Sequence, residues 1–275
     1  VQGEDAKVAN AIEEHYMPRN AGDAMPASII GSVLSIADRI DTISGCFSIG
    51  IQPTGSQDPY ALRRQAISII NIILDQELHI NLKSLIENAI KPFYNKGIIK
   101  AEVSNVIDDI NEFFKQRLRN VLLDRRYDYD VIDAVLKTGL IDIQDALLRI
   151  KELSDWKSQQ DFLSIAGSFN RVSNLAAKAD SLEINGELLA EKAEKELYES
   201  YTEVSKLFRD AVEKRDYYNA LKSLMLLKAP IDNFFDNTMV MVDDECIRRN
   251  RLALLKNIES MMMRFADLSV IVVSR

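Results

Sequence analysis

The sequence is poor in the residues that build metal centres and disulfide frameworks. Its 275 residues include two cysteines and two histidines. Cys46 and Cys246 lie far apart and flank apolar residues, and no cysteine pair has the spacing of a zinc site. We therefore expect both cysteines to be buried free thiols in a reducing cytoplasm.

Proline and glycine are also scarce, with six and ten residues, and most of them lie in the first hundred positions. The rest of the chain is rich in Leu, Ile, Ala, Glu and Lys, which are good helix formers. This composition predicts an all-α protein. The length favours two or three domains over one core.

Long apolar runs are missing as well. Even the stretch 65–74 (QAISIINIIL) is interrupted by polar residues and is far shorter than a membrane span. The opening lacks the charged and then apolar pattern of a secretory leader. We therefore expect a cytoplasmic protein with no membrane partner. Because the chain opens with Val1 inside a helical pattern, we also expect an upstream part.

The chain carries no overall excess of positive charge. Its net charge is −8, which weighs against a surface built wholly for nucleic acid, and we expect no DNA partner. The charge is nevertheless uneven, because residues 246–275 hold six basic residues against two acidic ones. A local basic face can still bind a polyanion, since electrostatic attraction is screened over about 10 Å at ordinary salt.

Apolar periodicity predicts helices in the first part of the chain. Residues 4–16 read as a helix closed by Pro18, and residues 28–43 as a helix capped by Ser28. The second helix carries one apolar stripe, made of Ile30, Val33, Leu34, Ala37 and Ile40.

The stretch 50–64 (GIQPTGSQDPYALRR) is the most loop-like part of the sequence. Asp58 and Pro59 have the order of a helix cap and a first helical residue, which predicts a helix from Pro59 to about Glu77. That helix is apolar on most faces, so we expect it to be buried. The loop lacks the lysine of a nucleotide-binding P-loop, and we interpret it as a helix entry.

Several helices follow along the rest of the chain, without a fixed repeat. Gly139 is expected to break the helical text of 130–152, with Asp130 and Asp142 as candidate caps. The later helices are expected at 161–179, 186–215 and 216–228, before a last apolar and basic run.

Three functional classes are compatible with these features. His15 and Asp38 are the weak candidates for a metal-dependent phosphohydrolase of the HD type, but no adjacent His-Asp pair occurs in the sequence. The acidic faces could instead make a structural module that docks other proteins. Basic side chains such as Arg63 and Arg64 favour a nucleic-acid-binding module, whereas the alternative for Arg63 or Arg251 is a structural ion pair inside a helix bundle. No G-x-S-x-G nucleophile motif occurs.

Three stretches of the sequence carry a specific resemblance. The segments EEHYMPRNAGDAMP and SVLSIADRIDTISGCFSIGIQPTGSQDPYALRRQA, and the end PIDNFFDNTMVMVDDECIRRNRLALLKNIESMMMRFADLSVIV, resemble the β subunit of bacterial tetrameric glycyl-tRNA synthetases. The end also resembles the helical anticodon-binding domain of arginyl-tRNA synthetases. The resemblance runs from about residue 4 to about residue 272.

The resemblance implies a domain organisation. Residues 1–98 would be the C-terminal part of a degenerate HD-like domain, residues 99–157 a helical linker region, and residues 158–275 the anticodon-binding domain. His15 and Asp38 match retained positions of the HD-like domain, whose upstream partner lies outside this chain.

The resemblance also implies function and partners. The partners would be glycine tRNA and the α subunit of an α2β2 tetramer, where ATP and Mg²⁺ act, so no cofactor and no catalytic residue is expected in this chain. Because the family's N-terminal domains are missing from it, we expect this chain not to support aminoacylation even with the α subunit. The HD-like part would face the acceptor side of the tRNA. Charge and position give the candidate tRNA contacts Arg63, Arg64, Arg171, Asn174, Lys178, Arg248 and Arg249.

Overall fold

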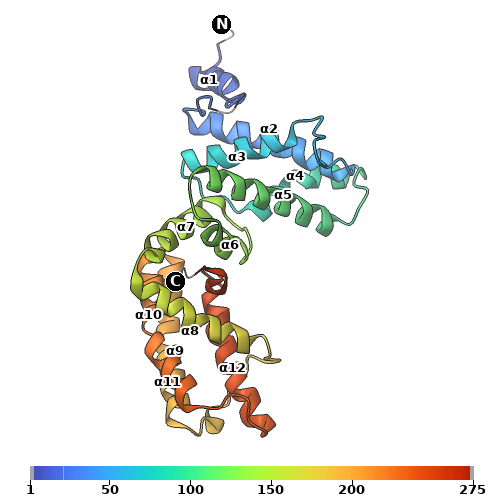
Figure 1. Ribbon diagram of the computed structural model, residues 1–275. Helices are drawn as coiled ribbons and strands as arrows, with labels where there is room; N and C mark the ends of the chain where they lie inside the picture. Colours follow the sequence, from blue (N-terminus) through green and yellow to red (C-terminus); the bar gives the residue numbers. More distant parts are fainter. Residues whose placement is uncertain (1–2, 21, 273–275) are drawn as a thin grey trace. The chain divides into compact units, whose positions relative to one another are not determined.

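The computed structural model in Figure 1 describes residues 3–20 and 22–272 and, over that part of the chain, contains helices and no strand. The all-α prediction is confirmed. The α-helices are Ala6–Glu14 (α1), Ile29–Ser48 (α2), Leu62–Asp75 (α3), Leu82–Asn95 (α4), Val103–Asp124 (α5), Tyr129–Leu136 (α6), Ile143–Lys157 (α7), Gln160–Ala176 (α8), Lys192–Glu213 (α9), Tyr217–Met225 (α10), Lys228–Asn237 (α11) and Glu245–Met262 (α12). Two short 3₁₀ turns are Gly186–Leu188 (η1) and Leu268–Val270 (η2).

Contacts divide the chain into two compact units. The first comprises Val1–Arg126 with Leu140–Leu147, and the second comprises Tyr127–Gly139 with Leu148–Arg275. Helix α5 groups with the first unit, although the predicted boundary at residue 98 separates it from the helices before it. The three-part division with boundaries at 98 and 157 stays a prediction.

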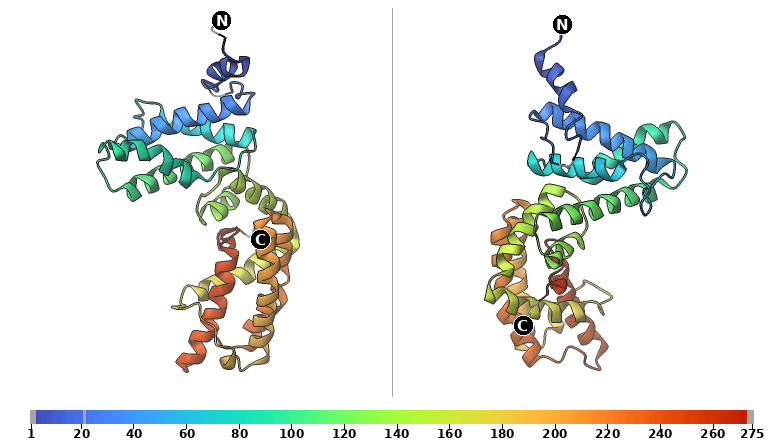
Figure 2. Two further views of the ribbon diagram at one scale, coloured as in Figure 1. Left: turned by 180° about the vertical axis from the view of Figure 1, so that it is seen from behind. Right: turned by 45° about the horizontal axis from the view of Figure 1, so that its top comes forward.

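In the first unit, α2 packs against α1, α3, α4 and α5, and the views of Figure 2 agree with Figure 1 that α2 and α3 lie side by side. Helix α3 is buried as predicted, since Ala66, Ile69, Ile70 and Ile72 have no exposed surface. A helix that is apolar all round needs neighbours on every side, and α3 has them in α2 and α5.

Helix α2 begins where the sequence predicts. The Ser28 side chain accepts a hydrogen bond from the Gly31 N–H, and the Ser28 hydroxyl in turn donates to the Glu14 carboxylate. A Cβ on Gly31 would overlap the Glu14 side chain, so glycine is what allows α1 to approach α2 this closely. The end of α1 is therefore held to the start of α2.

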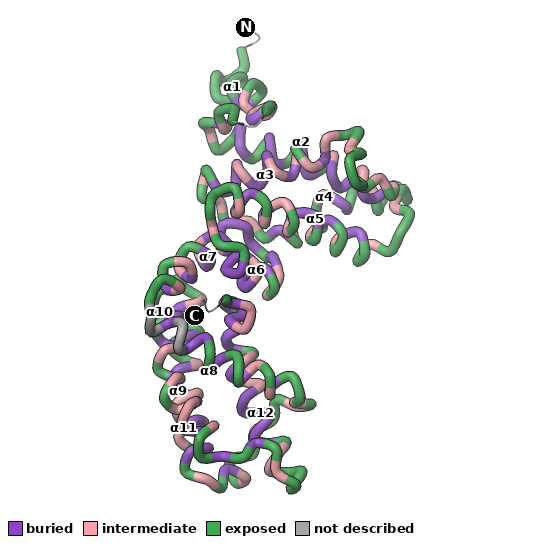
Figure 3. The backbone as a smooth tube through the Cα atoms, in the orientation of Figure 1, coloured by how far each residue is buried: buried purple, intermediate pink, exposed green. Residues whose placement is uncertain are grey.

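The predicted apolar stripe of α2 faces away from the core. Ile40 is buried, but Ile30, Val33, Leu34 and Ala37 are exposed. The buried side of the helix carries small polar residues instead, among them Ser32, Ser35, Ser44 and Ser48, together with Arg39. Figure 3 shows α2 as a helix with buried and exposed faces along its length.

In the second unit, α8 lies against α12, and α9 packs on α10 and α11. Fully buried phenylalanines fill the core between them, namely Phe169, Phe208, Phe234 and Phe265. Gly139, with φ of 100°, ends the stretch after α6 as predicted. Both cysteines are free, but Cys246 is exposed and Cys46 half-buried, so the prediction of two buried thiols was wrong. Cys246 lies in the first turn of α12, on the side away from the core.

Candidate nucleic-acid interface

The candidate site of the first unit starts from the entry to α3. The Asp58 carboxylate accepts hydrogen bonds from the N–H groups of Leu62 (2.8 Å) and Arg63 (3.0 Å), so its capping role is as predicted. Pro59 is not the first helical residue, however. A turn closed by the Ala61 N–H to the Asp58 carbonyl intervenes, and Ala61 has a left-handed φ of 54°. The helix therefore begins at Leu62.

This entry places the arginine pair at the first turn of α3. Arg63 is half-buried and Arg64 exposed, and within the described chain neither forms an ion pair. The structural ion pair that was the alternative for Arg63 is thus not seen there. Two guanidinium groups without an ion-pair partner in the described chain, close together at the start of a helix, are suited to an anion.

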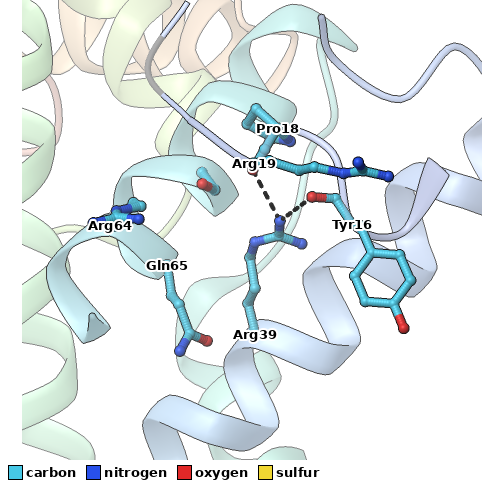
Figure 4. A pocket seen from close by; sticks show the side chains of 7 residues that line it. Tyr16, Pro18, Arg19, Arg39, Arg64 and Gln65 are labelled. Carbon is cyan, nitrogen blue, oxygen red and sulfur yellow. Dashed lines mark hydrogen bonds between the residues drawn. The ribbon is translucent and has the colours of Figure 1, made fainter. Parts of the chain in front are cut away.

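Arg64 lies between two neighbouring cavities. The first, about 490 Å³ in volume, is shown in Figure 4 and is lined by Tyr16, Pro18, Arg19, Arg39, Arg64, Gln65 and Ser68. The second, about 650 Å³ in volume, shares Pro18, Arg64 and Ser68 with the first and extends to α5. We call the two together the Arg64 groove.

Arg39 forms one wall of the first cavity. Its guanidinium donates to the carbonyl oxygens of His15 (2.9 Å), Tyr16 (3.1 Å) and Pro18 (3.1 Å), two of which Figure 4 marks, and also to Ser35. Burial lowers the pKa of Arg39, and Asp38 partly offsets this effect. The side chain fixes the turn that carries Arg19 while adding a positive charge to the wall.

The second cavity gathers further basic and amide groups. Arg63 and Arg125 line it together with Asp58 and Asp124, as do three amide side chains, Asn20, Asn71 and Asn120. Arg117 lies near Arg63 and stacks on the Phe113 ring at 3.9 Å. Burial lowers the pKa of Arg117, the neighbouring Arg63 charge lowers it further, and Asp58 opposes both. Arginine and amide groups that can bond to phosphate or ribose therefore line this cavity, next to two carboxylates.

His15 and Asp38, the candidate metal ligands, lie in the same unit but have different contacts. The His15 ring bonds to the Ile12 carbonyl and packs on Tyr16, and Asp38 lies exposed on α2 beside Arg39. Across the described residues, no three His, Cys, Asp or Glu side chains converge as a metal ion needs. His79 is tied into the fold instead, with its Nδ1 3.0 Å from the Asp142 carboxylate, which also caps α7.

In the second unit, α8 and the residues after it carry three of the predicted contacts. The Arg171 guanidinium lies over the Phe235 ring at 4.4 Å, and the Asn174 amide donates to Asn170 (3.1 Å). Arg171, Asn174 and Lys178 are all exposed. Their spacing puts them along one side of the helix and its end, which suits contacts with successive phosphates or bases.

Arg248 and Arg249 of α12 have protein partners. Arg248 turns back to the carbonyl of Val242 (2.9 Å), whereas Arg249 pairs with Asp180 (3.0 Å) and keeps about half of its side-chain surface exposed. Since Asp180 follows Lys178 by two residues, the structure brings Arg249 and the end of α8 together. Arg248 is directed instead toward the loop before α12.

Arg251 has the structural role that was its alternative interpretation. It is buried and donates to the carboxylates of Glu194 and Glu191 and to the Met239 carbonyl (2.7 Å). The sequence did not reveal its partners, because they come from α9 and the loop after α11. This arginine holds the start of α9 against α12 and fixes the loop that precedes α12.

In the described part of the chain, no helix combines the length and the apolar character needed to cross a bilayer.

Comparisons with known proteins agree with this architecture. Residues 1–137 match the family of the glycyl-tRNA synthetase beta subunit, and residues 166–268 match the DALR anticodon binding domain. The second match covers most of α8 and the whole of α9 to α12.

Curated relatives extend the match to nearly the whole chain. A glycine–tRNA ligase beta subunit of Desulforamulus reducens is 44% identical over 98% of this chain, and one of Clostridioides difficile is 44% identical over 99%. A third relative, from Geotalea daltonii, is 41% identical over 97%. The chain spans 38–39% of the length of these relatives. It belongs to the glycyl-tRNA synthetase beta subunit family and corresponds to the C-terminal portion of its members.

Proposed function

We propose that this chain is the tRNA-binding C-terminal portion of the beta subunit of a glycine–tRNA ligase, and that its second unit binds the anticodon end of glycine tRNA. The observation that carries the proposal is the match of residues 166–268 to an anticodon-binding domain, on which Arg171, Asn174 and Lys178 are exposed along one side. Arg249 adds a further cation near the end of that row. Cations and amides on one face are what backbone contact and base reading require.

The first unit takes a different part of the same tRNA. The Arg64 groove offers unpaired Arg63 and Arg64 beside the start of α3, and the ligand that fits them is the phosphodiester backbone on the acceptor side. This assigns the loop at 50–58 to positioning rather than to nucleotide binding, because Asp58 uses its carboxylate to cap the helix that presents the arginines.

The complete enzyme attaches glycine to its tRNA with ATP. In the proposal, the α subunit of an α2β2 tetramer holds the catalytic site with ATP and Mg²⁺, and residues of this chain touch tRNA only. A cytoplasmic location suits the two free cysteines, which a reducing compartment keeps as thiols.

A binding titration tests the proposal. Fluorescently labelled glycine tRNA, the same tRNA with a changed anticodon and a non-cognate tRNA are titrated with this chain at two salt concentrations. We expect the cognate tRNA to bind tightest, the anticodon change to weaken binding about tenfold or more, and salt to weaken all binding. Equal affinities for the three tRNAs would contradict the anticodon assignment.

A double variant of this chain tests the groove. The double variant Arg63→Ala with Arg64→Ala should weaken the binding of all three tRNAs alike. It should also reduce the slope of log K against log salt concentration by about one for each lost phosphate contact. The matched control is Lys96→Ala, an exposed cation at the end of α4, which should leave both quantities unchanged. If the double variant weakens the binding of the cognate tRNA alone, the arginines contact bases instead of the backbone.

A further inference from the structure

Several exposed apolar side chains of the first unit lie on its first two helices, α1 and α2. Ile30, Val33, Leu34 and Ala37 follow one side of α2 at helical spacing, and the first three are 40–54% exposed. Val8 and Ile12 of α1, at 44% and 56%, add a second pair one turn apart. Together with Ile29 at 54% these residues form what we call the α1–α2 face.

The face is not the outside of an ordinary amphipathic helix. The opposite side of α2 is already buried against α3, α4 and α5 through Ile36, Ile40 and Ile43. A helix that buries one side and carries an apolar stripe on the other is suited to lie between two layers of protein, and the described residues supply one of them. Helix α1 is also largely uncovered, because Ala11 alone among its nine residues is buried. Figure 3 shows α1 coloured mostly as exposed.

The relatives contain a long region that could supply the second layer of protein. The chain covers 39% of the Desulforamulus reducens subunit and matches its C-terminal portion, so most of that relative precedes the matched region. Helix α1 is the first helix of this chain, and the family match begins at residue 1. The polypeptide that leads into α1 in the longer relatives therefore arrives beside the α1–α2 face.

We propose that the α1–α2 face is the surface onto which the preceding part of the full-length beta subunit packs, which makes α2 an internal helix of the complete protein. The polar rim agrees with an interface edge, since Asp38 and Asp41 follow the apolar stripe on the same helix and are exposed. This inference concerns the assembly of the subunit and is independent of whether the chain binds tRNA.

Thiol labelling tests the proposal. The native thiols are first removed by Cys46→Ala and Cys246→Ser, and Val33→Cys is then introduced in this chain and in a full-length chimaera. The chimaera joins the upstream region of the Desulforamulus reducens subunit to this chain. We expect labelling of Val33→Cys to be roughly 100-fold slower in the chimaera, because the reagent must wait for a local opening. The matched control is Ser104→Cys, an exposed position in the first turn of α5, which should react at equal rates in both proteins.

Other outcomes would overturn the proposal. Fast labelling of Val33→Cys in both proteins would show that the upstream region leaves the face open. If Val33→Cys is labelled slowly in the isolated chain, and more slowly as the protein concentration rises, the face would be assigned to contact with a second copy of the chain. Protection that appears only when the α subunit is added would assign it to that partner.

A stability comparison keeps the proposal testable if the cysteine variants fold poorly. Ile30→Asp with Val33→Asp replaces exposed residues in this chain, so its melting temperature should stay unchanged. In the chimaera the same pair should lower the melting temperature clearly, since two carboxylates would be buried in an apolar contact. An equal effect in the two proteins would contradict the inference.

Discussion

At the scale of single residues, Arg251 and Glu194 form a buried ion pair in the second unit. Glu194 has no exposed surface, and its carboxylate accepts from both Arg251 and the Glu191 N–H. The same arginine reaches the Met239 carbonyl, so one guanidinium joins α9, α12 and the loop between α11 and α12. Buried charges of this kind are costly unless every partner is in place.

We predict that Arg251→Met destabilises the second unit by about 3–5 kcal/mol, because it leaves the Glu194 carboxylate buried and unpaired. Urea unfolding followed by the fluorescence of Trp156 measures this, since the chain has one tryptophan and it lies buried in the second unit. Arg248→Met is the matched control and should cost less than about 1 kcal/mol. Adding Glu194→Gln to Arg251→Met should recover part of the loss, and a double variant less stable than Arg251→Met would contradict the pairing.

Asp267 gives the second unit an acid-sensitive contact. Burial raises the pKa of Asp267, but hydrogen bonds from Lys137 and Ser269 outweigh it and hold the pKa below the ordinary value of 3.8. A carboxyl group whose folded pKa is depressed stabilises the fold above its unfolded pKa, and this contribution is lost as the pH falls through the folded value.

Asp267→Asn should therefore lower the free energy of unfolding at pH 7 by about 1–2 kcal/mol. The difference from wild type should shrink below about pH 4, where the wild-type carboxylate takes up a proton. Trp156 fluorescence in urea at several pH values measures both effects, and Asp236→Asn, on an exposed residue of α11, is the control. A difference that stays constant down to pH 2 would show that the ion pair is not its cause.

At the scale of elements, the entry to α3 combines a good cap with a strained residue. Asp58 satisfies two N–H groups of the first turn, whereas Ala61 adopts a left-handed conformation that costs an L-residue about 1–2 kcal/mol.

Ala61→Gly should relieve this strain and stabilise the first unit by about 0.5–1 kcal/mol, after the larger entropy of unfolded glycine is subtracted. Ala89→Gly inside α4 is the matched control and should destabilise by about 1 kcal/mol. Hydrogen exchange of the α3 amides measures the first effect. Faster exchange in Ala61→Gly would mean that the alanine methyl group contributes more than its strain costs.

Much of the fold follows from the sequence, since caps, breakers and apolar spacing are local signals. Ser28 and Gly139 mark helix boundaries correctly for that reason. The orientation of α2 could not be predicted in this way. Its apolar stripe is real, but which side meets the core depends on Ser32, Ser35 and the helices that pack on them.

The residues of the candidate site can likewise be divided into those that local sequence signals predict and those that depend on distant segments. The pair Arg63 and Arg64 could be predicted, because it follows a loop and a helix cap. Arg39 was not, because its role depends on carbonyls about twenty residues earlier in the chain. Asp130 was expected to cap a helix, yet it is buried and pairs with Lys157 (2.7 Å) and the Val272 N–H, which come from distant segments.

At the scale of the whole molecule, we propose that the two units bind two parts of one tRNA. The second unit carries the row of Arg171, Asn174 and Lys178, and the first carries the Arg64 groove. The two surfaces differ in kind, because the groove gathers arginines around a helix start, whereas the row combines an amide with cations along a helix. We expect the groove to supply affinity and the row to supply specificity.

Hydroxyl-radical footprinting of glycine tRNA bound to this chain tests that claim most directly. We predict two separate protected regions, one in the anticodon loop and one in the backbone on the acceptor side. Arg171→Ala with Lys178→Ala should remove the anticodon protection and leave the other in place. A bound complex whose anticodon loop is cleaved as readily as in free tRNA would contradict the account.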